Sequence, residues 1–220
     1  MTPESTAPPC PLCFREHAYL FHRDRFRRYY RCIHCHLVFV PQEEHVGHIE
    51  EKARYDRHNN EQNDPGYRKF LSRLLHPLRQ LIPPPAEGLD FGCGPGPALA
   101  AMCREEGYHM TLFDPLYAPN HAIWATTYDF VTCTEVVEHL RQPGITLPRV
   151  WSLLRPGGCL GIMTKLVQSP MPFASWHYIR DETHIAFYSQ ATFLWLAQRL
   201  EARVSFHGRD VILVHKQAWM

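Results

Sequence analysis

The chain lacks any apolar run that approaches the roughly 18 residues needed for a membrane helix. Residues 1–6 contain neither the basic segment nor the apolar segment of an export signal. Net charge is also nearly absent, at +1 with the histidines neutral, so no overall field draws the protein to nucleic acid or to a membrane. We therefore expect a cytoplasmic protein without membrane contact, in which any attraction to an anionic partner is local.

What the chain does have is enough apolar sequence for a core. Of its 220 residues, 45% are hydrophobic and 12% aromatic, against 20% charged, which excludes wholesale disorder. This length accommodates one α/β domain and a small appendage, but not two full-sized domains.

Four of the eight cysteines form two close pairs. Cys10 and Cys13, then Cys32 and Cys35, give the spacing C-x2-C-x18-C-x2-C, which is typical of zinc ribbons. Each pair places two thiolates on one backbone turn, and four sulfurs complete a tetrahedral Zn²⁺ with no open position. We therefore predict a structural zinc ribbon over residues 1–40. A nearby histidine replacing one cysteine remains an alternative; the candidates are His17, His22, His34 and His36.

Six arginines lie among aromatic residues between the cysteine pairs, against two acidic residues. Guanidinium groups bind phosphates and aromatic rings stack on bases, so this basic ribbon is a candidate RNA-binding surface. A hairpin face that docks on acidic groups of the same chain explains the pattern equally well. The arginines are Arg15, Arg23, Arg25, Arg27, Arg28 and Arg31.

The rest of the chain divides at a proline run. Residues 41–82 are predicted to form a polar linker and a helical lid, with apolar residues spaced as on a helix face over residues 66–82. Residues 83–220 alternate short apolar strands with helices and end in two strands, 202–206 and 211–214, joined by a tight turn. This pattern predicts an α/β domain with a Rossmann-like parallel sheet that finishes in an antiparallel hairpin.

A glycine-rich loop follows the first strand of this domain. Gly92, Gly94 and Gly96 allow the backbone to turn tightly and to approach a ligand closely. No Gly-Lys-Ser/Thr follows, so the loop is not a nucleotide P-loop, and the glycine spacing is not the dinucleotide pattern G-x-G-x-x-G. Asp114, 22 residues after Gly92 at the end of the next strand, is placed to accept both ribose hydroxyls of a nucleoside cofactor.

With these motifs the sequence resembles the class I S-adenosylmethionine (SAM)-dependent methyltransferases. The matching segments cover roughly residues 86–220 and read LDFGCGPG at 89–96, FDP at 113–115, YDFVTCTEVVEHL at 128–140 and LRPGG at 154–158. More narrowly, the chain is similar to bacterial members that carry a zinc ribbon. The resemblance implies a seven-stranded sheet and a bound SAM, with the three glycines beside the methionine portion, Asp90 helping to fix the ammonium group, and Asp114 holding the ribose.

The sequence departs from this family pattern after Asp114. Only 15 residues separate Asp114 from Phe130, so we expect the third strand and its helix to be truncated. The acidic residue that commonly reads the adenine amine has no clear counterpart, and Pro115, Leu116 or Trp124 is the expected adenine contact.

Glu135, Glu138 and His139 follow the fourth strand at positions i, i+3 and i+4, which a helix would present on one face. With His184 from a later polar loop they form a candidate site for Mg²⁺, Mn²⁺ or a second Zn²⁺. The motif is similar to the Glu-x-x-Glu-His of small-RNA 2′-O-methyltransferases and quinone-precursor O-methyltransferases. A divalent cation there would assist deprotonation of a hydroxyl, with His139 or His184 accepting the proton. The structural alternative is that both glutamates merely favour a helix N-terminus.

Three functions are consistent with these features. The first is a SAM-dependent O-methyltransferase assisted by a divalent metal, acting on a hydroxyl-bearing substrate such as an RNA ribose. The second is a methyltransferase for a small molecule, such as a sugar or a quinone precursor, without RNA binding. The third is a non-catalytic adaptor that binds SAM.

Overall fold

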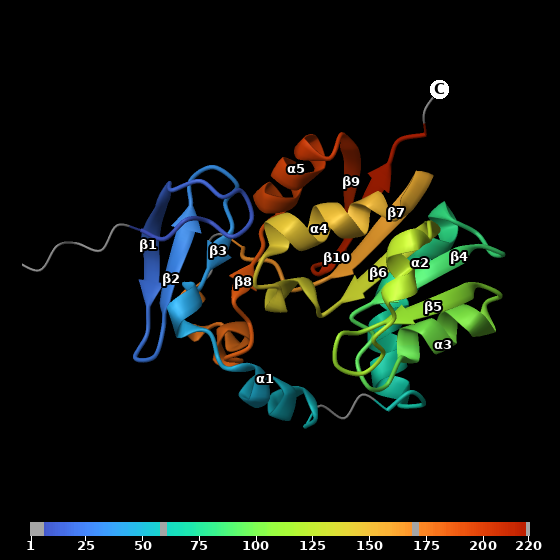
Figure 1. Ribbon diagram of the computed structural model, residues 1–220, viewed down its shortest axis with the longest axis horizontal. Helices are drawn as coiled ribbons and strands as arrows, with labels where there is room; N and C mark the ends of the chain where they lie inside the picture. Colours follow the sequence, from blue (N-terminus) through green and yellow to red (C-terminus); the bar gives the residue numbers. More distant parts are fainter. Residues whose placement is uncertain (1–6, 58–60, 169–171, 219–220) are drawn as a thin grey trace, which may run out of the picture.

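The computed structural model describes residues 7–57, 61–168 and 172–218. The remaining residues, which fall within all three predicted segments, lie outside this description. Two sheets organise the chain, one of six strands and one of four, and Figure 1 shows them at opposite ends of the molecule. Within the described ranges, no helix is both long and apolar enough to cross a bilayer.

The larger sheet has the strand order β5-β4-β6-β7-β10-β9, in which β10 alone runs antiparallel to its neighbours. The predicted Rossmann-like sheet that ends in an antiparallel hairpin is therefore confirmed. Its strands are β4 (Glu87–Phe91), β5 (His109–Phe113), β6 (Tyr128–Thr134), β7 (Leu154–Met163), β9 (Ala202–His207) and β10 (Val211–Lys216).

The expected count of seven strands is wrong, because the described residues form six strands in this sheet. The connection from β5 to β6 is too short for a strand and a crossover helix. In their place it holds an isolated bridge between Asp114 and Ala118 and a short 3-10 helix, η2 (His121–Ala125). The sheet therefore ends at β5, directly beside the strand that carries the glycine loop.

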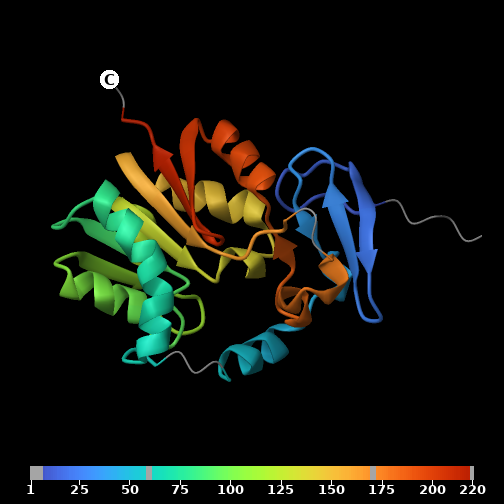
Figure 2. The ribbon, with the colours of Figure 1, turned by 180° about the vertical axis from the view of Figure 1, so that it is seen from behind.

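Helices cover both faces of the large sheet (Figures 1 and 2). Side chains alternate across β7, so Cys159 and Met163 pack in one core and Leu160 and Ile162 in the other. The first core is completed by α2 (Pro65–Leu81) and α3 (Ala98–Glu105), and the second by α4 (Pro143–Ser152) and α5 (Gln190–Arg199).

The structure places α2 with the sheet and not with the predicted lid. Asp64 caps the helix by accepting from the amide of Tyr67, and Leu71, Leu74 and Leu78 are buried against β6, β7 and β10. The predicted boundary at residue 83 thus falls between α2 and the sheet that its apolar face covers. The proline run after α2 leads directly into β4.

The smaller sheet combines the amino-terminal region with a distant segment. Its order is β1-β2-β3-β8, and all three pairings are antiparallel. The strands are β1 (Ala18–Arg23), β2 (Arg28–Cys32), β3 (Val38–Phe39) and β8 (Ala186–Phe187). Strand β8 directly follows the polar loop that carries His184. The hydrogen bonds between β8 and β3 therefore connect this loop to the small sheet.

Short elements connect the two sheets. Between β3 and α2 the chain forms η1 (Gln42–Glu44) and α1 (His48–Tyr55), and both views show α1 between the two sheets at their lower edge (Figures 1 and 2). After β7 it forms η4 (Phe173–Ser175) and η5 (His177–Arg180), and η3 (Val137–His139) follows β6. These elements supply much of the lining of the cavity described next.

Candidate functional site

The glycine loop after β4 is shaped for close approach. Gly92 and Gly94 both have positive φ, +78° and +61°, which disfavours any residue with a Cβ. A Cβ on Gly92 would lie 2.5 Å from Val136, whereas one on Gly94 would project into open space. Packing therefore requires glycine at Gly92, while at Gly94 the missing Cβ leaves room for a ligand.

Asp114 fixes this loop from the neighbouring strand. Its Oδ2 accepts a hydrogen bond of 3.0 Å from the amide of Gly94. Its Oδ1 accepts from the amides of Leu116 and Tyr117, at 2.8 and 3.1 Å. Each carboxylate oxygen can accept more than one hydrogen bond, so Asp114 retains acceptor capacity for a ligand.

A cavity of about 1160 Å³ opens over this loop. Of the residues expected to bind a cofactor, Gly92, Gly94, Asp114 and Pro115 line it, as do the adenine candidates Leu116 and Trp124. Gly96 and Asp90 are not among the lining residues. Asp90 is buried beneath the loop, where it accepts a 2.7 Å hydrogen bond from the hydroxyl of Thr132, and burial raises the pKa of its carboxyl group to about 6.

The segment after β6 is not the helix that the i, i+3, i+4 spacing predicted. It forms one 3-10 turn, η3, and Glu135 takes a left-handed conformation with φ of +53°. The prediction that Glu135, Glu138 and His139 share a helix face is therefore wrong.

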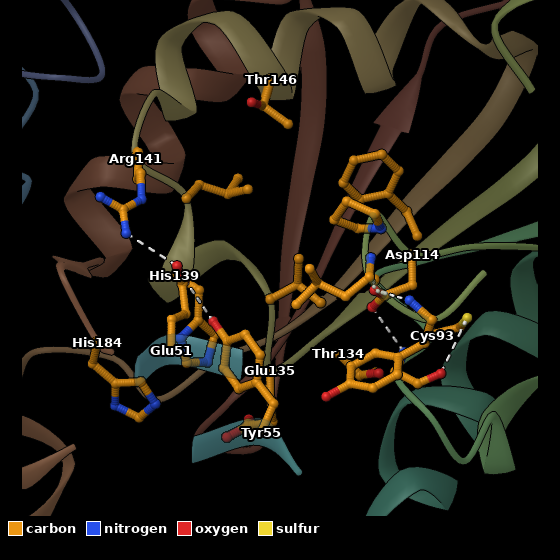
Figure 3. A pocket seen from close by; sticks show the side chains of 18 of the residues that line it. Glu51, Tyr55, Cys93, Asp114, Thr134, Glu135, His139, Arg141, Thr146 and His184 are labelled. Carbon is orange, nitrogen blue, oxygen red and sulfur yellow. Dashed lines mark hydrogen bonds and ion pairs between the residues drawn. The ribbon is translucent and has the colours of Figure 1, made fainter. Parts of the chain in front are cut away.

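The turn nevertheless brings Glu138 and His139 together with His184. One ligand atom from each of these three residues lies within 4.8 Å of the others, and Glu135 is not part of this group. Figure 3 shows His139 and His184 on one side of the cavity, facing Asp114 and Cys93 across it. Glu135 lines the cavity between the two sides.

Both histidines are oriented by main-chain carbonyls. Nδ1 of His184 lies 2.8 Å from the carbonyl oxygen of Tyr178, and Nδ1 of His139 lies 3.1 Å from that of Thr183. A carbonyl only accepts, so in each neutral ring the proton is on Nδ1 and the lone pair on Nε2. This second hydrogen bond is the usual arrangement of metal-binding histidines.

The two glutamates are buried acids. Oε1 of Glu135 and Oε2 of Glu138 find no hydrogen-bond partner among the described residues. Burial raises the pKa of both carboxyl groups, and the charge of Glu135 raises that of Glu138 further. A buried carboxylate oxygen without a donor is costly, and a bound cation would relieve that cost.

Tyr178 belongs to this site although the sequence patterns did not single it out. Its hydroxyl donates to Oε1 of Glu138 and lies 3.2 Å from the hydroxyl of Thr164. It therefore orients the glutamate, as the carbonyls orient the histidines. Nothing in the sequence marks this role, because the contact joins η5 to η3 across 40 residues.

Helix α1 covers the histidine side of the cavity. The ring of Tyr55 meets that of His139 edge-on, with centroids 5.2 Å apart. Glu51 holds α1 in place through a 3.0 Å ion pair with Arg141, drawn in Figure 3. Of the two helices in residues 41–82, where a linker and lid were predicted, α1 contacts the cavity and α2 packs on the large sheet.

The four predicted cysteine ligands come together at a separate place, at the end of β2 in the small sheet, where Cys32 lies in the strand and the other three lie in or directly before turns. Their sulfur atoms all lie within 4.8 Å of one another, with 3.4 Å between Cys10 and Cys35 and 3.5 Å between Cys13 and Cys32. Zinc–sulfur bonds of about 2.3 Å would hold tetrahedral sulfurs about 3.8 Å apart, so the cluster fits a zinc ion. No histidine belongs to this group within the part of the chain that the structure describes.

Two of the six arginines of the predicted RNA-binding surface are engaged within the chain. Arg28 forms ion pairs with Glu43 and Glu44, and Arg27 is only 7% exposed because its side chain enters the loop before β8. Arg15, Arg23 and Arg25 are exposed. The basic surface is therefore smaller than the sequence suggested.

Comparison with known proteins identifies the domain. The profile of the methyltransferase domain family matches residues 58–204. Over 100 residues the chain is 32% identical to a ubiquinone biosynthesis O-methyltransferase of Aeromonas salmonicida, an alignment that spans 34% of this chain and 42% of that protein.

Two solved structures share the fold. A 1,6-didemethyltoxoflavin-N1-methyltransferase of Burkholderia thailandensis, with its substrate and S-adenosylhomocysteine (SAH) bound, matches with a TM-score of 0.55 at 15% identity, covering 91% of this chain and 99% of that one. A SAM-dependent methyltransferase of Archaeoglobus fulgidus matches with a TM-score of 0.54 at 16% identity, covering 68% and 94%. With its glycine loop, its sheet order and a family profile that matches most of its length, this chain belongs to the methyltransferase domain family.

Proposed function

We propose that the protein transfers a methyl group from SAM to a hydroxyl group of a compact acceptor, assisted by a divalent cation. The observation that carries this proposal is the single cavity that reaches from Gly94 and Asp114 to His139 and His184. A cofactor site and an acid–histidine group thus open into one cavity, as a transfer between two bound molecules requires.

The glycine side of the cavity fits SAM, which supplies an electrophilic methyl group on a sulfonium. The open space at Gly94 admits the methionine portion close to the backbone. Asp114 would accept hydrogen bonds from the ribose hydroxyls through its remaining lone pairs. Trp124, which packs edge-on against Phe91 and Phe113, offers an apolar wall for the adenine.

The opposite side fits a divalent cation held by Glu138, His139 and His184. The support is the partnerless Oε2 of the buried Glu138, together with the Nδ1 hydrogen bond that leaves a lone pair on Nε2 of His184. A cation there would lower the pKa of an acceptor hydroxyl and orient it. Histidines that bind a cation cannot also take a proton, so we assign proton acceptance to Glu135, whose burial makes it a stronger base.

The cysteine cluster is proposed to hold a structural zinc ion. Its four sulfurs leave no coordination position for a substrate, and it lies at the end of β2, apart from the cavity lining. The ion would stabilise a sheet whose strands are only two to six residues long.

For the acceptor we favour a small phenolic or polyhydroxyl molecule. Helix α1 covers the histidine side of the cavity through Tyr55 and Glu51. A compact substrate fits beneath this cover. The ubiquinone biosynthesis O-methyltransferase that this chain resembles is named for such chemistry. RNA ribose is the second candidate, supported by the exposed arginines of the small sheet, and a SAM-binding adaptor without turnover is the third.

The test offers radiolabelled SAM with catechol, with a small polyol, or with short single-stranded RNA. We expect label on a small hydroxyl compound, loss of transfer when the divalent cation is chelated, and at least a hundredfold lower kcat in Glu138→Gln. Glu182→Gln, which changes an exposed glutamate of the neighbouring loop, should match the wild type. Salt-sensitive labelling of RNA alone would favour the second candidate. Full turnover after chelation would overturn the metal-assisted mechanism.

A further inference from the structure

The β1–β2 turn of the small sheet sends one buried side chain into the methyltransferase domain. Arg27 is 7% exposed, and its guanidinium donates to four main-chain carbonyls of the loop before β8. Nη1 lies 2.9 Å from Glu182 O and 3.0 Å from His184 O, and Nη2 lies 2.6 Å from Ile179 O and 3.2 Å from Asp181 O. One side chain thus binds most of a six-residue loop that has little secondary structure of its own.

Arg27 is itself held rigidly. Oδ1 of Asp24 accepts from the amides of Phe26 and Arg27, both at 2.7 Å, and its Oδ2 accepts from the hydroxyl of Tyr29 at 2.9 Å. The guanidinium lies 5.4 Å from the centre of the Tyr29 ring. The turn therefore presents Arg27 in one orientation, and the loop takes its shape around it.

The loop that Arg27 holds ends at His184. On the far side of this histidine, the amide of Ile185 donates to the carbonyl of Glu138 at 2.9 Å, and the Ile185 carbonyl accepts from Val40 at 2.9 Å. Strand β8 then pairs with β3. His184 therefore sits between two attachments, and Arg27 supplies the attachment on the amino-terminal side.

Loss of the Arg27 side chain would change the structure of the loop before β8. Four carbonyls would lose their charged donor, and the buried contacts to His184 O and Ile179 O would leave acceptors without a partner, which is unfavourable. The loop would rearrange to bring those carbonyls to water, carrying His184 with it. Displacements near 1 Å are enough to disturb a ligand set or a reacting geometry.

We propose that Arg27 is a positioning residue that sets the place of His184 in the divalent-cation site, so that the small cysteine-bearing sheet shapes the acceptor side of the cavity. This inference rests on the proposed function, because it takes His184 as a ligand of the cation. It assigns the small sheet a role in the active site beyond binding zinc. It also gives a reason for the burial of one arginine of the basic segment.

The test measures Mn²⁺ binding by calorimetry to protein that retains its zinc, in the wild type, Arg27→Gln and Arg25→Gln. Arg25 lies on the same turn with an exposed side chain and serves as the matched control. We expect Arg27→Gln to weaken Mn²⁺ binding at least tenfold while zinc content and SAH affinity stay within twofold of the wild type. Arg25→Gln should match the wild type in all three measurements.

If Arg27→Gln does not fold, Arg27→Ala is measured with and without millimolar guanidinium ion, which can occupy the vacated space. Recovery of Mn²⁺ affinity with guanidinium, but not with the same concentration of sodium, supports positioning of the loop by the guanidinium hydrogen bonds of Arg27. Unchanged Mn²⁺ affinity in Arg27→Gln, or no recovery with guanidinium, overturns this inference alone. A wild-type protein that binds no Mn²⁺ overturns the divalent-cation site and this inference together.

Discussion

The carboxylate of Asp114 accepts a 3.0 Å hydrogen bond from the amide of Gly94, which ties the end of β5 to the loop after β4. This hydrogen bond within the chain helps to order the loop. In most encounters between a flexible loop and a ligand, ordering the loop reduces affinity, so a loop that is already ordered favours binding. The carboxylate has two roles in this account, to hold the loop and to meet the ribose.

Replacing Asp114 by asparagine should therefore damage the cofactor site. The amide cannot accept at both of its heteroatoms, so either Gly94 or the Leu116 and Tyr117 amides lose their acceptor. We predict at least a tenfold loss of SAH affinity, measured by calorimetry. Asp129→Asn is the matched control, because Asp129 also accepts from a main-chain amide and an arginine, but at the start of β6. Equal losses in the two variants would contradict a specific role for Asp114.

Two glycines test whether the open space at Gly94 is the cofactor site. Gly94 and Gly208 have similar positive φ, +61° and +67°, and a Cβ on either would meet no atom within 4 Å. Alanine at each should cost about 1 kcal/mol of stability for the same backbone reason. Only Gly94→Ala should weaken SAH binding, since Gly208 lies in the turn between β9 and β10. If both variants bind SAH as the wild type does, the cofactor lies elsewhere.

The cysteine cluster should contain one zinc ion per chain. We predict that Cys32→Ser loses this metal, as measured by elemental analysis. We also expect its thermal unfolding midpoint to fall by more than 10 °C, because the metal no longer links the two cysteine pairs. Cys133→Ser changes a buried cysteine of β6 outside the cluster and should keep the zinc. Wild-type protein that is purified metal-free with its four thiols intact would contradict the assignment.

Stability should depend on pH through Asp90. Burial raises the pKa of this carboxyl group from 3.8 to about 6, so the native state holds the proton more tightly than the unfolded chain does. The folded protein consequently loses stability relative to Asp90→Asn as the pH rises from about 4 to 6, by about 3 kcal/mol in total. Urea unfolding of both proteins between pH 5 and 7.5, without cofactor, measures the difference.

The same unfolding series includes Asp129→Asn as its control. Hydrogen bonds from the Glu87 amide and Arg155 outweigh burial and hold the pKa of Asp129 below its usual value, so its contribution is constant across this pH range. A stability gap between the wild type and Asp90→Asn that stays flat from pH 5 to 7.5 would show that Asp90 is already ionised in the folded protein at pH 5, which contradicts a raised pKa.

Local patterns in the sequence were sufficient for much of the fold. The strands and helices of the large sheet, the terminal hairpin and the glycine loop follow from apolar periodicity and turn residues, and the structure confirms them. Asp114 was found in the same way, because it ends a strand beside the loop. The gathering of the four cysteines also follows from spacing, since each pair lies on one turn.

Local sequence patterns do not predict contacts between distant segments. Strand β8 is two residues long, so no periodicity marks it, and its pairing with β3 depends on the whole fold. The spacing of Glu135 and His139 fits a helix, but Glu135 takes a left-handed conformation and the residues after it form one 3-10 turn. Arg27 looked like one of six surface arginines, and only its hydrogen bonds to residues more than 150 positions away reveal a different role.

The most direct test of the central claim is calorimetric titration of the folded, zinc-bearing wild-type protein with SAM and with SAH. The account predicts about one site per chain for each ligand, with at least tenfold weaker binding of both in Gly94→Ala. A protein that is folded by circular dichroism and yet gives no binding heat at several temperatures with either ligand would contradict it.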